Sequence, residues 1–85
     1  RRVILTTAIP DVAGSLVELL NVISKTGANV ISVNHDRLNL NVSLKKAEVE
    51  LVLETKDANH IDKVVSSLKK QGYNLKQISD FNKEW

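Results

Sequence analysis

The chain has 85 residues, which is enough for one small domain and too few for two. Its composition, 42% hydrophobic and 26% charged, is typical of a folded domain and excludes an intrinsically disordered chain. Basic and acidic residues are interspersed and leave a formal charge of only +2, so a nucleic-acid partner is disfavoured.

The sequence also lacks the features of a membrane protein or a metal site. No apolar run approaches the roughly 20 residues that span a bilayer, and no signal peptide is evident, so we expect no membrane partner and a cytoplasmic location. The absence of cysteine and the wide separation of two histidines argue against any metal ligand set. Because the chain starts without methionine, directly on a strand pattern, we expect one domain of a longer protein, with its core over 3–78 and a tail over 79–85.

The first half of the chain predicts a strand, a helix and a second strand. The run from Arg2 to Ile9 is apolar on both phases, and its expected inward side chains are Val3, Leu5 and Ile9. A helix follows, because apolar residues recur with the spacing i, i+3, i+4, i+7 at Leu16, Leu19, Leu20 and Ile23. We expect Gly27 to end this helix as a left-handed cap, and a β-rich run from Asn29 to about Arg37 to form the next strand.

The second half predicts the same three elements. Lys46 to Thr55 alternates apolar and acidic residues, which indicates a strand with one buried face. Asp57 is a suitable N-cap for a helix that ends at Gly72, and Tyr73 to Ile78 forms the last strand. Between the halves, residues 37–45 alternate in polarity without a turn signal, which leaves either a long hairpin or a mobile loop.

An internal repeat relates the two halves. The second helical pattern has the same spacing as the first and consists of Ile61, Val64, Val65 and Leu68. Each of these residues lies 45 positions after its equivalent in the first pattern, and Gly72 likewise lies 45 positions after Gly27. The order β-α-β-β-α-β predicts an α+β, ferredoxin-like sandwich with a four-stranded antiparallel sheet and both helices on one face. On the other face we expect Ile4, Val52 and Ile78, which a homo-oligomer or the rest of the parent protein would cover.

No residue pattern predicts catalysis in this chain. Acidic and histidine side chains are scattered, and a sheet with helices on one side has little volume for a catalytic cleft. We expect His60, in the first turn after Asp57, to be a solvated helix residue.

The turn from the first strand into the first helix, Ile9 to Leu16, is the one candidate binding site. A helix N-terminus offers unpaired N–H groups and a partial positive charge, and a glycine there, Gly14, lets a carboxylate approach the backbone. The structural alternative is that Pro10 and Asp11 end the strand and cap the helix, while Gly14 avoids a clash.

These residues resemble those of ACT domains, from about Val3 to Ile78. The resemblance rests on an Asp-x-x-Gly-Ser-Leu turn, a Leu-x-x-Leu-Leu-x-x-Ile helix and the following Gly-Ala-Asn-Val-Ile. Three further segments resemble the C-terminal domain of single-ACT threonine dehydratases (ammonia-lyases): residues 9–11 (Ile-Pro-Asp), 35–37 (His-Asp-Arg) and 48–51 (Glu-Val-Glu-Leu). Many family members read Asp-Arg-Pro-Gly in the turn, whereas this chain has Val12 and Ala13 in the middle positions.

The resemblance implies an allosteric sensor. Domains of this kind pair through their sheets or helices and bind a free amino acid between the turn of one copy and the second strand of another. Here that implies a site formed by Asp11, Val12, Ala13, Gly14, Ser15, Leu16, Asn29, Val30, Ile31 and Asn34. The implied effector is isoleucine or valine, and the implied parent is a pyridoxal-phosphate enzyme that deaminates threonine or serine. This chain itself would hold no cofactor and would act on the parent's catalytic domain.

Other functions of the same topology fit less well. An RNA-binding sheet needs aromatic residues, and this chain has one each of Phe, Tyr and Trp. A metal carrier needs paired cysteines, and an acylphosphatase-like enzyme needs an arginine after the first strand, where Asp11 stands. The alternatives that remain are an ACT-like oligomerisation module that has lost its ligand, which Val12 and Ala13 favour, and the regulatory domain of another enzyme of amino-acid metabolism.

Overall fold

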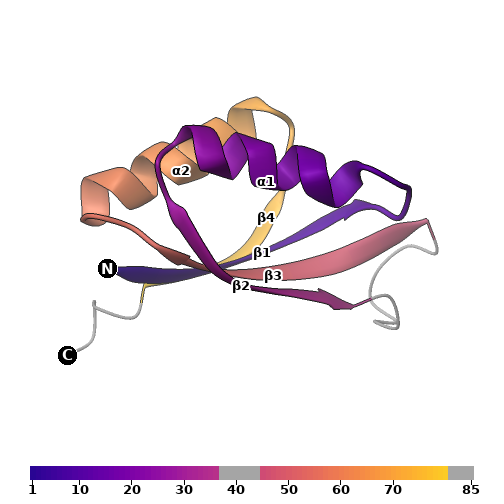
Figure 1. Ribbon diagram of the computed structural model, residues 1–85, viewed down its shortest axis with the longest axis horizontal. Coiled ribbons are helices and arrows are strands. Elements are labelled where there is room, and N and C mark those ends of the chain that lie inside the picture. The colour runs from indigo at the N-terminus through magenta and orange to yellow at the C-terminus, as the bar shows by residue number, and fades with distance from the viewer. Residues whose placement is uncertain (37–44, 81–85) are drawn as a thin grey trace.

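A computed structural model describes residues 1–36 and 45–80 and has two layers, a four-stranded sheet and two helices on one of its faces (Figure 1). The elements in chain order are β1 (Arg2–Pro10), α1 (Ser15–Lys25), β2 (Asn29–Asp36), β3 (Lys46–Glu54), α2 (Ala58–Lys70) and β4 (Leu75–Asp80). This is the predicted βαββαβ arrangement, and the predicted fold class is confirmed.

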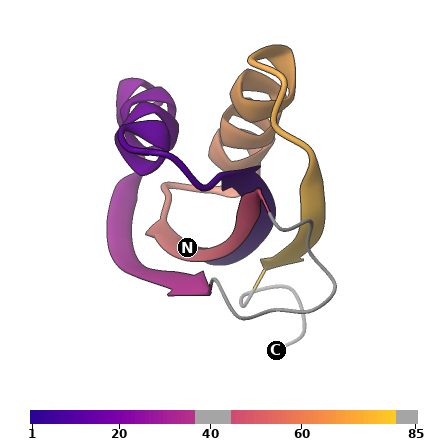
Figure 2. The same ribbon diagram turned by 90° about the vertical axis from the view of Figure 1, so that its right-hand side faces the viewer.

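The sheet has the order β2-β3-β1-β4, and all three pairs of strands are antiparallel. Each helix crosses over the sheet between two strands that are not neighbours. Figure 2 shows the result: α1 lies above the β2 edge and α2 above the β4 edge, and the sheet curves around the space beneath them. Both outer strands, β2 and β4, therefore have one backbone edge without a partner in the sheet.

The core lies between the sheet and the helices. The expected inward residues of β1, Val3, Leu5 and Ile9, are buried, and Thr7 is buried with them. The core is completed from the other elements by Leu19, Ile23, Val49, Leu51, Leu53, Ile61, Val64 and Leu68. The alternation in β3 and the helical spacing therefore identified the packed faces correctly.

Both glycines predicted to end the helices do so in the left-handed region, with φ of +84° at Gly27 and +93° at Gly72. At Gly72 the chain forms a Schellman motif, because the amide of Tyr73 donates to the carbonyl of Leu68 and that of Gly72 donates to Lys69. Asp57 is the N-cap of α2, as predicted, and its Oδ1 accepts a hydrogen bond from the His60 amide at 2.8 Å.

One expected orientation is wrong. Ile4 and Val52 pair with each other on the face away from the helices, as predicted, but Ile78 pairs with Leu5, a core residue, and so belongs to the helix-side face. The reason is an irregularity in β4: Gln77 pairs with Thr6 and Leu75 with Thr7, which leaves Lys76 as an extra residue and reverses the alternation after it. On this edge strand Ile78 is still 46% exposed.

Other expectations differ by a few residues or cannot be compared. β4 begins at Leu75, two residues after the predicted start, and runs to Asp80. The hairpin or loop expected over 37–45 lies, except for Lys45, outside the described residues. Within the described ranges, neither helix is both long enough and apolar enough to cross a membrane.

Candidate functional site

The predicted turn leads from the end of β1 into α1. The Asp11 amide donates to the Lys45 carbonyl at 2.8 Å, which fixes the turn to the start of β3. Gly14 is the N-cap of α1 and has φ of +88°, so glycine is required here by backbone conformation. A Cβ at Gly14 would meet nothing within 4 Å, so the expected clash is not the reason for this glycine.

Two of the first four amides of α1 have no hydrogen-bond acceptor within the described residues. The Ser15 amide donates to the Val12 carbonyl and the Glu18 amide to the Gly14 carbonyl, but those of Leu16 and Val17 have no acceptor within the described residues. Gly14, and not Asp11, is the N-cap of this helix, so the expected capping by Asp11 is wrong, whereas β1 does end at Pro10 as the structural alternative proposes. At α2 the Asp57 carboxylate fills the corresponding place, which leaves α1 as the helix start that is open to an external carboxylate.

The surface around this turn is exposed and partly apolar. Val12 is 66% and Val17 61% exposed, and Ala13 and Gly14 are exposed as well. Leu16 is different, because it is partly buried and packs against the core. Ser15 is also partly buried. The turn therefore offers N–H groups beside apolar side chains, which suits a ligand with a carboxylate and an aliphatic part.

The β2 residues of the predicted site divide between the two faces of the sheet. Val30 pairs with core residue Leu53 and packs against the core, whereas Asn29 and Asn34 pair with Glu54 and Glu50 on the opposite face. Ile31 lies at a register shift between Val30 and Ser32 and is 42% exposed.

Within one copy these two segments do not meet. Asn29 shares a row of the sheet with Glu54 and Arg2, near the start of β1, whereas the turn follows the end of β1. Asn34 is nearer, in the row of Glu50 and Thr6, but faces away from the helices. A single chain therefore presents the predicted residues as two separate surfaces.

No protein-family model matches the chain. Curated relatives do: the chain is 38% identical over 78 residues to an L-threonine ammonia-lyase of Thermotoga maritima and 35% identical over 69 residues to one of Geobacter sulfurreducens. These matches cover 92% and 81% of the chain.

Solved structures share the fold at low sequence identity. An ACT domain protein from Streptococcus pneumoniae superposes with a TM-score of 0.59 at 15% identity, over 92% of this chain and 86% of that one. The chain has the fold of an ACT domain. The acetolactate synthase small subunit of Thermotoga maritima contains the same fold, with a TM-score of 0.71 at 13% identity over 99% of this ACT domain and 50% of that chain.

The ACT domain accounts for only part of the enzymes it resembles. It spans 20% of the length of the Thermotoga relative and 17% of the Geobacter relative. The segment shared with these ammonia-lyases has the ACT fold. In its described residues no group of three His, Asp or Glu side chains could hold a metal ion.

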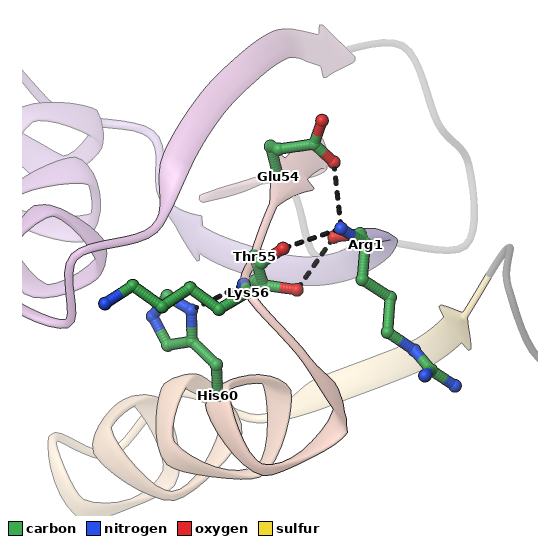
Figure 3. Close-up of polar contacts among 5 residues, drawn as sticks. All are labelled: Arg1, Glu54, Thr55, Lys56 and His60. Atoms are coloured by element: carbon green, nitrogen blue, oxygen red, sulfur yellow. Dashed lines mark hydrogen bonds and ion pairs between the residues drawn. The ribbon is translucent and has the colours of Figure 1, made fainter.

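The sequence analysis missed the role of His60, which is half-buried and not a solvated residue. Its Nδ1 accepts a hydrogen bond from the Lys56 amide at 3.0 Å (Figure 3). Because that amide can only donate, Nε2 carries the ring hydrogen and donates to the Thr26 carbonyl at 2.7 Å. His60 therefore joins the start of α2 to the end of α1, and its partner lies 34 residues away, so no local pattern could reveal it.

Two clefts among the described residues lie along the helices. One, of about 350 Å³, surrounds His60 and includes Thr26 and Lys63, and the other, of about 270 Å³, lies between α1 and α2. Neither includes a residue of the predicted turn or of β2. This placement is consistent with a turn site that is incomplete in one copy.

Proposed function

We propose that this ACT domain senses a free amino acid and regulates a threonine ammonia-lyase of which it is a segment. The observation that carries the proposal is the uncapped start of α1. The amides of Leu16 and Val17 lack acceptors within the described residues, at the positive end of an 11-residue helix. An α-carboxylate would supply these acceptors, and the exposed side chain of Val12 lies in the same turn.

The β2 edge supplies the second half of the proposed site. Ile31 and Val33 are 42% and 37% exposed on a strand with a free backbone edge, a combination that favours pairing with a second copy. If two β2 strands pair antiparallel about their centres, the Asn29 end of one copy lies beside the Asp36 end of the other. The turn of the second copy is at that end, so pairing would bring together the two surfaces that one chain keeps apart.

The effector we propose is isoleucine or valine. A small aliphatic side chain matches the exposed Val12 and Ile31, and the relatives are named for an enzyme that acts on threonine. By preferring one pairing of the ACT domains, the effector would bias the catalytic domains of a cytoplasmic parent enzyme, and a coupling of about 1 to 3 kcal/mol would suffice. Pyridoxal phosphate would belong to those catalytic domains and to none of the residues of this chain.

A thermal-shift screen of the 85-residue chain against the twenty amino acids tests the proposal. A ligand at a hundred times its Kd adds about 2.7 kcal/mol to the stability of the folded state. For a domain of this size that corresponds to a rise in Tm of about 10 to 20 °C. We expect isoleucine or valine to raise the Tm, and no stabilisation by any amino acid at millimolar concentration would contradict the sensor function.

Matched variants locate the site. Ala13→Glu places a carboxylate in the exposed turn and should abolish the rise in Tm, because it repels the carboxylate of the ligand. Ala58→Glu makes the same change at the exposed start of α2 and should leave the rise in Tm intact. Equal shifts in both variants would move the site away from the turn.

A second pair of variants tests the pairing. Ile31→Lys and Ile78→Lys make the same change on the two edge strands at similar exposure, 42% and 46%. Only Ile31→Lys should convert dimers to monomers in analytical ultracentrifugation and remove the amino-acid shift. A wild-type dimer that no amino acid stabilises would instead support an oligomerisation module that has lost its ligand, which the departures at Val12 and Ala13 favour.

A further inference from the structure

The groove between the two helices is lined mainly by basic and polar side chains. We call it the helix furrow: the cleft of about 270 Å³ whose lining includes Lys25, Thr26, Lys63, Ser67, Lys70 and Gln71. It contains three lysines, two hydroxyl groups and an amide, and no acidic residue lines it. It shares Thr26 and Lys63 with the cleft around His60, whose lining adds both a cation, Lys56, and a carboxylate, Asp57.

The three lysines of the helix furrow have no ion-pair partners within the described residues. Salt bridges in that part of the chain instead join Glu48 to Lys76 and Glu54 to the terminal amine of Arg1. The sequence offers no helical partner either, because none of the three lysines has an acidic residue three or four positions away. Within the described residues, no acidic side chain forms an ion pair with these lysines.

Helix dipoles explain two of these lysines but not the third. Lys25 and Lys70 occupy the last turns of α1 and α2, where a cation is favourable. Lys63 is the sixth residue of α2, in the half nearer the positive end of the helix, and it is exposed. Its position beside Lys25 and Lys70 therefore adds repulsion without a benefit from the dipole.

We propose that the helix furrow binds a small multivalent anion, an oligophosphate or a polycarboxylate. The three ammonium groups would neutralise two or three negative charges, and the Ser67 hydroxyl and Gln71 amide would donate hydrogen bonds. The volume is near the lower limit of small-molecule pockets and suits a ligand of this class. This site is separate from the turn of α1 and goes beyond the proposed amino-acid sensing.

Because the lysines are exposed, binding should be moderate and sensitive to salt. We expect a Kd on the order of 1 mM at low ionic strength, weakening as salt screens the charges. Each lysine should contribute about threefold to fivefold in affinity, the upper range for exposed ion pairs.

The test is a titration of the ¹⁵N-labelled chain followed by amide chemical shifts. The probes are tripolyphosphate and citrate, with acetate at matched ionic strength as the monovalent control. We expect saturable shifts of Thr26, Lys63, Ser67 and Gln71 with at least one multivalent probe and none with acetate. The stronger of the two probes would identify the class, phosphate or carboxylate.

Lys69 provides a matched control, because it is exposed on α2 next to Lys70 but does not line the helix furrow. Lys63→Gln should weaken the binding of the stronger probe about threefold to fivefold, whereas Lys69→Gln should change it less than twofold. Equal weakening in both variants would show diffuse attraction to a basic surface and overturn the proposal. So would unsaturated shifts with both multivalent probes at ten times the expected Kd.

Discussion

Two adjacent threonines in β1 should respond in opposite ways to the same substitution. Thr7 is fully buried and its Oγ1 donates to the Asn74 carbonyl at 2.8 Å. Thr6 is 6% exposed, and its Oγ1 is buried without a hydrogen-bond partner within the described residues. Valine has the shape and the β-branching of threonine, so Thr→Val at each position removes the hydroxyl and little else.

The hydrogen-bond arithmetic gives the expected magnitudes. Thr7→Val leaves the Asn74 carbonyl without its donor, which should cost about 1 to 2 kcal/mol. Thr6→Val removes a hydroxyl that was desolvated without compensation, which should stabilise the fold by about 1 kcal/mol. The two variants should therefore differ by about 2 to 3 kcal/mol, or by about 10 to 20 °C in Tm.

Urea unfolding of both variants, followed by circular dichroism, measures the difference directly. Unchanged m-values would show that the comparison concerns the folded state. Two variants that lose stability equally would refute the reasoning, because Thr6 Oγ1 would then have a compensating partner.

Three further predictions follow from the helix ends and the titratable groups. His60→Ala removes the hydrogen bonds to Lys56 and Thr26 and should lower the free energy of unfolding, measured in urea, by about 1 to 2 kcal/mol. The control Asn59→Ala changes an exposed neighbour in the same cleft and should lower it by less than about 0.5 kcal/mol. Similar losses in the two variants would contradict the bridging role of His60. Gly14→Ala should cost about 1 kcal/mol from its φ of +88° alone, with no steric term, and a stabilised variant would refute a left-handed N-cap. Burial and the nearby Glu18 carboxylate raise the pKa of Tyr73 in the folded state. The neutral phenol of Tyr73 should therefore contribute fully to stability below pH 10, and this contribution should be lost as the pH rises through the pKa of Tyr73 in the folded chain. Absorbance at 295 nm follows this sole tyrosine, and a midpoint below that of the urea-unfolded chain would contradict the prediction.

The sequence was sufficient for the fold because its signals are local and repeated. The helical spacing and the glycines at 27 and 72 recur with one offset, and each glycine ends its helix in the predicted conformation. The inward residues of β3 followed from alternation alone, and those expected for β1, which is apolar on both phases, are buried as well. Alternation failed at Ile78, because it assumes an unbroken period of two, and the extra residue at Lys76 breaks it.

The candidate site was harder to predict from the sequence, because it depends on which backbone amides lack a hydrogen-bond acceptor. Aspartate is a residue type that favours the N-cap position, yet Gly14 is the N-cap of α1. The amides of Leu16 and Val17 have no acceptor within the described residues. His60 depends on a contact with Thr26 across the molecule. Neither property follows from residue types or their spacing, and both require the three-dimensional path of the chain.

The two edges of the sheet differ in a way that would limit growth of an assembly. β4 carries a charged residue, Lys76, and an irregular register, both of which oppose strand addition, whereas β2 contains no lysine, arginine or proline. The β2 edge therefore favours the addition of another strand and the β4 edge opposes it, so each chain can extend the sheet on one side. If two copies join through β2 as proposed, the combined sheet would end at a β4 strand on each side, and the complex would stop at two copies instead of growing into a fibril.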